Sequence, residues 1–181
     1  MFANLRPAFG ITLVFFVLLG LAYPLAETGI GQAFFSHQAN GSLTSYGSTL
    51  VGQTWKGPRW FQGRPDADNP MATGGTNLGP RSEALVKAVG EQITQLKKEG
   101  ITPTPDLVTT SGSGVDPDIT PADAYAQVNA VARARGLPAA AVRRLVAEHV
   151  QQPQFGFLGS AYIDVLQLNE ALEALQQKEG R

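Results

Sequence analysis

Residues 7–26 form a stretch that carries no charge and consists mostly of apolar side chains. A helix rises about 1.5 Å per residue, so a helix of this length spans roughly 30 Å, the thickness of the hydrocarbon core of a bilayer. A helix in the core of a soluble protein is instead usually polar along one face. We therefore predict a transmembrane helix over residues 7–26, with Gly10 and Gly20 as points of close approach to other helices.

A cleaved signal peptide is the main alternative for this segment. The apolar core of a signal peptide is usually about 7–15 residues long and precedes a small-x-small cleavage site. Here the apolar stretch is longer, and its exit from Tyr23 to Glu27 lacks an Ala-x-Ala pattern. An uncleaved anchor is therefore favoured. Pro24 is expected to end or kink its helix, because proline lacks a backbone N–H.

The basic residues that flank the apolar stretch predict its orientation. Arg6 and the terminal amine precede it, and the next basic residue along the chain is Lys56. Positively charged flanks favour the cytoplasmic side of a membrane. We expect residues 1–6 in the cytoplasm and residues 27–181 outside it, as an extracytoplasmic domain.

Composition narrows the possible partners and chemistry. The chain has 14 basic and 15 acidic residues and a formal net charge of −1. Nucleic-acid binding requires clustered lysine and arginine, so we expect no nucleic-acid partner. The sequence contains no cysteine, which excludes disulfides, thiolate nucleophiles and cysteine-based metal sites.

The segment after the anchor is irregular. Residues 27–56 are rich in glycine, serine and threonine, and they predict an extended linker that ends in a first short strand near residues 48–53. Residues 57–80 are rich in Gly, Pro, Asp and Asn, a composition that favours an ordered loop over regular structure. Residues 57–181 are expected to form a mixed domain, and the linker is either separate from it or part of one unit over residues 27–181.

Several helices are predicted in this domain. An apolar stripe runs from Leu85 to Leu96, and Gly100 is placed to cap the end of that helix. Thr120, followed by proline and then aspartate, is a strong helix start, and this helix is expected to run to Gly136.

The carboxyl-terminal part alternates between helix and strand signals. A further helix is predicted from Pro138 to about residue 150, and Asn169 is expected to cap the last one. Residues 107–110 and 162–166 have strand character. The predicted fold class is α+β: one amino-terminal transmembrane helix, then a mixed extracytoplasmic domain with a small sheet and about four helices.

Catalytic motifs are not apparent. No Gly-Lys dipeptide occurs, which excludes a Walker A loop, and no Asp-Lys-Thr-Gly sequence occurs, which excludes the phosphorylation site of a P-type ATPase. The loop 111–114 resembles a nucleophile loop or phosphate cradle but lacks the Gly-x-Ser-x-Gly spacing. A tight loop between elements is therefore favoured, and we expect no catalytic or cofactor-binding residue.

Metal binding is not expected either. Two acidic pairs have the carboxylates that calcium prefers, but neither is completed by the glycine and glutamate of a calcium loop. The pairs are Asp66 with Asp68, and Asp116 with Asp118. His37 and His149 lack cysteine or histidine companions at ligand spacing.

Arg64 stands out within the glycine- and proline-rich loop. It precedes Pro65, and Trp55, Trp60 and Phe61 come shortly before it. An arginine in such a loop either donates hydrogen bonds to backbone carbonyls or presents its planar fork to a partner. The aromatic residues are either core or, together with Arg64, anchors of an interface.

Nine short fragments stand out, in order along nearly the whole chain: Leu5-Arg6-Pro7-Ala8, Tyr23-Pro24-Leu25, Gln38-Ala39-Asn40-Gly41-Ser42-Leu43, Gly63-Arg64-Pro65, Gly74-Gly75-Thr76-Asn77-Leu78-Gly79-Pro80, Ser111-Gly112-Ser113-Gly114-Val115-Asp116-Pro117, Ile119-Thr120-Pro121, Gly156-Phe157-Leu158-Gly159 and Val165-Leu166-Gln167-Leu168-Asn169. In their order and spacing, these fragments resemble one known family, the C subunits of the Kdp potassium-transporting P-type ATPase. The chain departs from the family at Asp118, where histidine is frequent, and over residues 160–164, where a Glu-Pro-Arg-Val-Asn-like run is frequent.

The resemblance implies a single-pass subunit of the bacterial inner membrane with a periplasmic domain. Its implied partners are a channel-like potassium-binding subunit, a P-type ATPase subunit, a small single-helix subunit and membrane lipid. Its implied role is non-catalytic: assembly of a high-affinity potassium uptake complex, and capping or modulation of the extracellular potassium entrance. A membrane-anchored hydrolase and a stand-alone binding module are the alternatives.

Residues in the two glycine-rich loops and in the loop around Arg64 are candidates for partner contact or for shaping the loops. They are Arg64, Pro65, Gly74, Gly75, Asn77, Ser111, Gly112, Ser113, Gly114 and Asp116.

Overall fold

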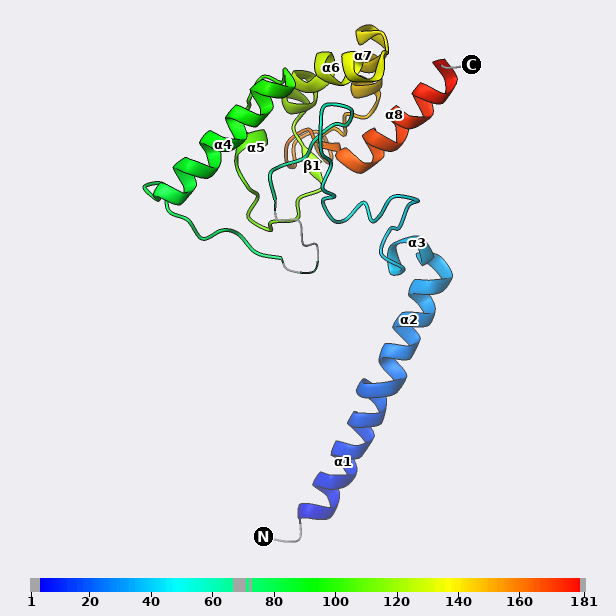
Figure 1. Cartoon of the computed structure of the whole chain (residues 1–181). Coiled ribbons are helices and arrows are strands. Elements are labelled where there is room, and N and C mark those ends of the chain that lie inside the picture. Colours follow the sequence, from blue (N-terminus) through cyan, green and yellow to red (C-terminus); the bar gives the residue numbers. More distant parts are fainter. Residues whose placement is uncertain (1–3, 67–70, 72, 180–181) are drawn as a thin grey trace. The chain divides into compact units, whose positions relative to one another are not determined.

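The computed structural model (Figure 1) describes residues 4–66, 71 and 73–179. The chain divides into two compact units, Met1–Leu43 and Thr44–Arg181. Each unit is described separately below.

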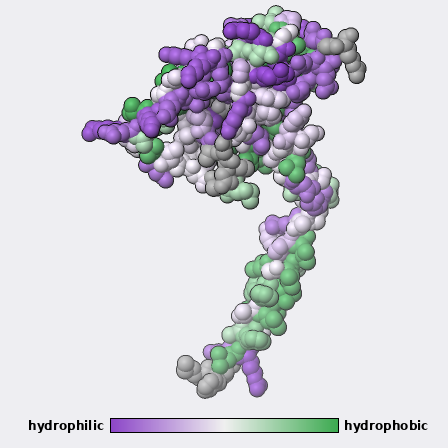
Figure 2. Space-filling model, viewed as in Figure 1, coloured by the Kyte–Doolittle hydropathy of each residue, from purple (hydrophilic) through white to green (hydrophobic). Residues whose placement is uncertain are grey.

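The first unit is dominated by one long helix. It comprises α1 (Leu5–Val17), the π-helical turn η2 (Leu18–Ala22) and α2 (Tyr23–Phe34), and the short helix α3 (Ser36–Ala39) follows. The continuous helix Leu5–Phe34 is 30 residues long, and by its length and composition it is apolar enough to cross a membrane. Figure 2 shows hydrophobic residues along most of it. The predicted apolar helix is therefore present, and it extends beyond residue 26.

Pro24 does not end the helix. It occupies the first turn of α2, directly after the π-helical turn η2. Proline removes one helical hydrogen bond, and its ring clashes with the carbonyl four residues earlier, here that of Gly20. A wider π turn is one known way in which a helix accommodates a local disturbance of its hydrogen-bond ladder. The prediction of an end at Pro24 was wrong for this reason.

The described residues of the second unit form five helices and a two-stranded sheet. The helices are α4 (Glu83–Glu99), α5 (Pro105–Val108), α6 (Pro121–Arg135), α7 (Ala139–Glu148) and α8 (Val165–Glu179). Strands β1 (Asp118–Ile119) and β2 (Ile163–Asp164) pair antiparallel, with Asp118 opposite Asp164 and Ile119 opposite Ile163. The α+β fold class is confirmed.

The helix ends follow the predicted signals. Gly100 and Gly136 adopt left-handed conformations, with φ of 75° and 67°, at the ends of α4 and α6. Thr120 and Asp123 form a reciprocal capping box at the start of α6. These caps satisfy backbone groups that a helix end otherwise leaves without partners.

Two predicted strands are absent. Residues 49–51 form a turn and a bend instead of a strand. The Leu50 N–H donates to the Ser48 hydroxyl (3.1 Å), a local bond that competes with strand pairing. Residues 105–108 form α5, with Pro105 in its first turn, where proline is favoured. The apolar character of Leu107 reflects complete burial within this short helix and not a strand.

Asn169 does not cap the last helix. That helix, α8, begins four residues earlier, and the Asp164 carboxylate accepts the Gln167 N–H (2.8 Å) at its start. Asn169 is fully buried, and its amide exchanges two hydrogen bonds of 2.9 Å with the backbone of Phe61. The position that sequence reasoning assigned to a helix cap therefore binds a distant loop.

The hydrophobic core lies mainly among α6, α7 and α8. Its buried members include Phe61, Ile119, Val128, Val131, Val142, Val146, Ile163, Leu168 and Leu172. A smaller cluster joins α4 and α5 to α6 and consists of Leu96, Ile101, Leu107 and Ala130. Of the predicted stripe on α4, only Leu96 is buried among the described residues of that helix.

Two buried amides fix the loop that precedes Arg64. Gln127 accepts the Gln62 N–H (2.7 Å) and donates to the Gln62 carbonyl (3.0 Å), just as Asn169 does for Phe61. Both amide side chains are fully buried. Because each satisfies its own polar atoms and those of the loop, the loop is held without a neighbouring strand.

Arg135 on α6 holds the same loop from the other side. Its guanidinium carbon lies 4.2 Å from the ring centre of Trp60, and its Nε donates to the Arg59 carbonyl (2.6 Å). It also forms an ion pair of 3.1 Å with Glu173 on α8. These contacts anchor the loop to two helices and thereby position Arg64.

Candidate functional site

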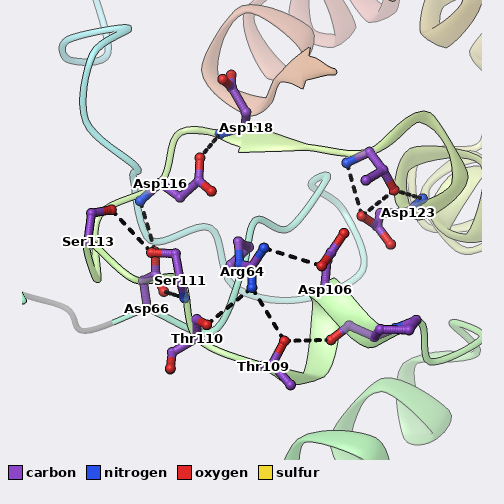
Figure 3. A network of polar contacts seen from close by, with 12 residues as sticks. Arg64, Asp66, Asp106, Thr109, Thr110, Ser111, Ser113, Asp116, Asp118 and Asp123 are labelled. Carbon is purple, nitrogen blue, oxygen red and sulfur yellow. Dashed lines mark hydrogen bonds and ion pairs between the residues drawn. The ribbon is translucent and has the colours of Figure 1, made fainter. Parts of the chain in front are cut away.

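Arg64 binds the segment that follows α5. One terminal nitrogen donates to the Asp106 carboxylate (3.2 Å). The other donates to the Thr110 carbonyl (3.1 Å) and, more weakly, to the Thr109 hydroxyl (3.4 Å). Figure 3 shows these three acceptors around the guanidinium. The planar fork is thus engaged within the unit by a carboxylate, a hydroxyl and a backbone oxygen.

Asp66 organises the loop that contains Ser111. Its carboxylate accepts the Ser111 N–H (2.7 Å), the Ser111 hydroxyl (2.7 Å) and the Asp116 N–H (2.9 Å), as Figure 3 shows. Hydrogen bonds to an ionised acceptor are the stronger kind. Arg64 thus binds the residues at and just after α5, and Asp66 binds the residues that precede β1. Together they connect the loop that contains them to the segment between α5 and β1.

The two glycine segments meet backbone to backbone. The Gly74 N–H donates to the Ser113 carbonyl (2.6 Å). Gly114 has a φ of 71°, and a Cβ atom there would lie 2.6 Å from the Gly74 carbonyl oxygen. A Cβ on Gly75 would lie 3.2 Å from the Gly112 carbonyl oxygen. This close approach requires a residue without a side chain at Gly114.

The remaining candidate residues lie at the edge of this arrangement. Gly112, Ser113 and Asn77 are exposed, and Asn77 has a φ of 55°. Pro65 is half-buried beside Arg64. The structure therefore brings together Arg64, Pro65, the 74–75 segment and the 111–116 loop, and the contacts described here do not include the Asn77 side chain.

Gly10 and Gly20 belong to the first unit and lie on its long helix. A Cβ atom on Gly10 would meet nothing within 4 Å, and one on Gly20 would lie 4.0 Å from the Phe16 ring. Both positions thus present low, open surface on the apolar helix.

Two cavities adjoin the network. One has a volume of about 500 Å³, and its lining combines polar residues such as Gln62, Arg64 and Glu99 with apolar ones such as Trp55 and Val165. The other, of about 420 Å³, has a mixed lining in which Leu78, Leu85, Val89 and Val108 are large apolar members. Pro65, Gln92 and Gln95 line both.

Two carboxylates lie opposite each other at the end of the network. Burial, with the nearby Asp164 and Asp116 carboxylates, raises the pKa of Asp118 to about 6. Burial also raises the pKa of Asp164, against hydrogen bonds from the backbone that lower it. The Asp116 carboxylate accepts the Asp118 N–H (3.0 Å). Sequence reasoning weighed Asp116 and Asp118 as calcium ligands, did not expect calcium there, and did not foresee the pairing of Asp118 with Asp164.

The arrangement lacks the relations that nucleophilic catalysis requires. The Ser111 hydroxyl donates to a carboxylate and contacts the Ser113 hydroxyl (3.2 Å). The His149 ring contacts the Leu145 carbonyl within its own helix (2.8 Å), and His37 belongs to the other unit. Within the second unit, the contacts of the Ser111 hydroxyl do not include His149. Within the described part of the chain no cluster of three metal-ligating side chains occurs, and Asp68 lies outside that part.

Some residues of the network were missed from the sequence. Asp106 and Thr109 both accept hydrogen bonds from the Arg64 guanidinium. They are three residues apart, the spacing at which side chains share one face of a helix. Reading residues 107–110 as a strand hid that spacing. A Thr-Pro-Asp sequence at 104–106, the same helix-start signal as at Thr120, was the clue that could have revealed α5.

The fold and the network define a membrane-associated protein with one apolar helix and one α+β unit. A family model described as "K+-transporting ATPase, c chain" matches residues 5–174. A Potassium-transporting ATPase KdpC subunit from Sorangium cellulosum (strain So ce56) is 50% identical over 187 residues, covering 96% of this chain and 98% of the relative. The chain therefore belongs to the KdpC family of potassium-transporting ATPase subunits.

Other relatives agree with this assignment. KdpC subunits from Caulobacter vibrioides (strain NA1000 / CB15N) and Geobacter sulfurreducens (strain ATCC 51573 / DSM 12127 / PCA) are 45% and 46% identical, over 99% and 95% of this chain and 100% and 98% of theirs. The resemblance drawn from short fragments is confirmed. The chain is accordingly a subunit of a potassium-transporting ATPase complex, and partner subunits follow from that membership.

Proposed function

We propose that this chain is a non-catalytic accessory subunit of a high-affinity, ATP-driven potassium uptake complex. It supports assembly of the complex and caps or modulates the extracellular potassium entrance. The observation that carries the proposal is how Arg64 and Asp66 are used. Arg64 binds Asp106, Thr109 and the Thr110 carbonyl, and Asp66 binds Ser111 and the Asp116 N–H, so both residues hold the loops in place. Loops held in this way suit a partner contact better than bond-breaking chemistry.

The proposed topology is a single pass through the bacterial inner membrane. Residues 1–6 lie in the cytoplasm and the second unit lies in the periplasm, because Arg6 is the one basic residue before Lys56. The continuous apolar helix Leu5–Phe34 is long enough for such a pass. Residues 35–43 follow this helix and lead to the second unit.

The proposed partners are a channel-like subunit, a P-type ATPase subunit and a small single-helix subunit. Helix packing in lipid favours small residues at contacts, and Gly10 and Gly20 offer open positions on the apolar helix. A single span with Thr12 as its one internal hydroxyl between residues 7 and 22 cannot supply a ring of oxygen ligands. The chain therefore modulates access of potassium and does not conduct it.

An anchored binding module is the second candidate function. The cavity of about 500 Å³ beside Arg64 and Glu99 favours it, because its size suits a small ligand. This reading predicts that the chain is stable and unaccompanied after gentle extraction from the membrane.

The natural absence of cysteine gives a direct test of the topology. Asn4→Cys and Ser160→Cys each introduce the single thiol of the chain, and both positions are exposed. In cells with a permeabilised outer membrane, an impermeant maleimide is expected to label Ser160→Cys and to spare Asn4→Cys until the inner membrane is opened. The reverse pattern would contradict the proposed orientation.

A functional test uses potassium-stimulated ATPase activity of the purified complex. We expect a complex prepared without this chain to lose that activity, and readdition of the full chain to restore it. Full activity in the absence of the chain would overturn the accessory role.

A further inference from the structure

A short hairpin between α7 and α8 is braced by backbone hydrogen bonds. Gln151 and Tyr162 exchange two of them, at 2.8 and 3.1 Å, and Gln154 and Leu158 exchange two more, at 3.0 and 2.9 Å. Gly156 N–H adds a bond to the Pro153 carbonyl (2.9 Å). The tip between these bridges is therefore held in one backbone conformation.

The hairpin tip, defined as Phe155, Phe157 and Leu158, places large apolar side chains in solvent. Their exposed fractions are 80%, 75% and 49%. No charged residue occurs from position 150 to position 163. A contiguous exposed apolar group of this kind marks an interaction site more often than chance surface exposure does.

The backbone at the tip is strained. Phe155 has a φ of 54°, a region in which a bulky residue other than glycine is an outlier. In the described part of the chain Ser42 and Asn77 are the other such residues, and they are small or polar. Because the Phe155 ring is exposed, core burial does not offset this strain. Strained residues persist where function requires them.

The geometry points to the hairpin tip as an aromatic anchor that docks into an uncharged, apolar pocket on another subunit of the ATPase complex. This inference rests on the proposed function, because it takes the chain to assemble with such subunits. Buried aromatic anchors commonly dominate the binding energy of interfaces. A tip that is already rigid also loses little conformational freedom on binding.

The tip fits a protein pocket better than a lipid surface. Residues that settle at membrane interfaces are typically tryptophan, tyrosine and basic residues, and anionic lipid attracts clusters of lysine and arginine. The tip has phenylalanine and leucine, the tyrosine of the hairpin, Tyr162, lies at its base opposite Gln151, and the hairpin has no basic residue. The absence of charge likewise requires a partner surface without unpaired charges, since a buried unpaired charge is costly.

Site-specific photocrosslinking tests the docking in the assembled complex. A photoreactive phenylalanine analogue is placed at Phe157 and, as a control, at Val86, which is 66% exposed on α4. The full chain is produced with the other subunits and purified in mild detergent. We expect the Phe157 position to crosslink to another subunit with at least about tenfold higher yield than the Val86 position.

Crosslinks from Phe157 to lipid alone, in a complex that is otherwise intact, would overturn the docking but leave the accessory role standing. If the unsubstituted chain does not copurify with the other subunits, the proposed function fails and the docking fails with it. The two failures are thus distinguishable.

A variant pair separates docking from folding. Phe155→Gly removes the aromatic ring and also relieves the left-handed backbone, so the midpoint of thermal unfolding should stay equal or rise. The chain should nevertheless be lost from the complex at least about tenfold faster in a detergent wash, in line with truncation of an interface anchor. Gln152→Ala, an exposed polar change on the same hairpin, should change neither quantity. If the Phe155→Gly chain is lost from the complex no faster than the unsubstituted chain, the proposal is overturned.

Discussion

At the scale of single residues, the Asp118–Asp164 pair gives the unit an unusual dependence on pH. The two residues are opposite each other in the β1–β2 ladder, and the pKa of both is raised, that of Asp118 to about 6. An unfolded aspartate has a pKa of about 3.9. Between these values the folded chain holds more protons than the unfolded chain, so this pair lowers stability as pH rises through about 4 to 6.

The substitution Asp118→Asn removes one member of the pair. We expect it to raise the free energy of unfolding at pH 7.5 by about 1 kcal/mol or less, because the half-exposed group is screened by solvent. At pH 4.5 the gain should be smaller, since the folded carboxyl is then already largely protonated. Thermal unfolding of the full chain in detergent at the two pH values measures this. An equal gain at both would contradict the assignment.

Gly114 is the glycine on which the meeting of the two loops depends. Gly114→Ala forces a side chain into a left-handed conformation and to within 2.6 Å of the Gly74 carbonyl oxygen. We expect a loss of about 1–3 kcal/mol in the free energy of unfolding. Gly112→Ala is the matched control, because a Cβ atom there meets nothing within 4 Å. Denaturant unfolding of both variants should separate them, and equal stabilities would contradict the described packing.

Part of the network was predictable residue by residue, and part was not. Arg64 and the 111–114 loop stand out because arginine and glycine have distinctive chemistry within loops of this composition. Asp106 could not be assigned to Arg64, because the two are 42 positions apart and their contact depends on tertiary packing. The same holds for Asn169, which binds Phe61 across 108 positions.

At the scale of elements, the quality of local signals decides which helix ends are stabilised by side chains. At α6 the Thr120 hydroxyl accepts the Asp123 N–H (3.3 Å), and the Asp123 carboxylate accepts the Thr120 N–H (3.0 Å). At α4, Ser82 occupies the corresponding position but its side chain makes no capping hydrogen bond. The same residue class therefore contributes differently at the two helices.

This difference is testable by a pair of alanine variants. Thr120→Ala should cost about 1 kcal/mol in the free energy of unfolding, the usual loss for an N-cap that bonds its helix. Ser82→Ala should lower the free energy of unfolding by no more than a few tenths of a kcal/mol, because the Ser82 side chain makes no capping hydrogen bond that could be lost. A large loss at Ser82, measured by denaturant unfolding, would contradict the described cap.

The elements with strong local signals, α4, α6 and α7, were predicted with their approximate bounds. Of the short elements, β2 lies within the predicted strand 162–166, whereas β1 and α5 were not predicted. β1 and β2 have two residues each, and α5 has four. Segments of this length carry too little periodicity to distinguish helix from strand, and their conformation is decided by neighbours in space.

At the scale of the whole molecule, the apolar helix Leu5–Phe34 sets where the chain resides. Deletion of residues 1–34 should move the chain from the membrane fraction to the soluble fraction, because the remaining sequence contains no comparably long apolar stretch. Cell fractionation with detection of a carboxyl-terminal tag measures this. Continued membrane association of the shortened chain, when the other subunits are absent, would contradict a role for this helix as the anchor.

The most direct test of the accessory-subunit account is gentle detergent extraction of the tagged chain from potassium-starved cells, with mass spectrometry of the proteins that accompany it. If the chain is an accessory subunit, a P-type ATPase subunit and a channel-like subunit should accompany it in comparable amounts. Deletion of residues 1–34 should abolish the potassium-stimulated ATPase activity. Recovery of the chain alone, from cells in which those subunits are expressed, would contradict the account and favour the anchored binding module.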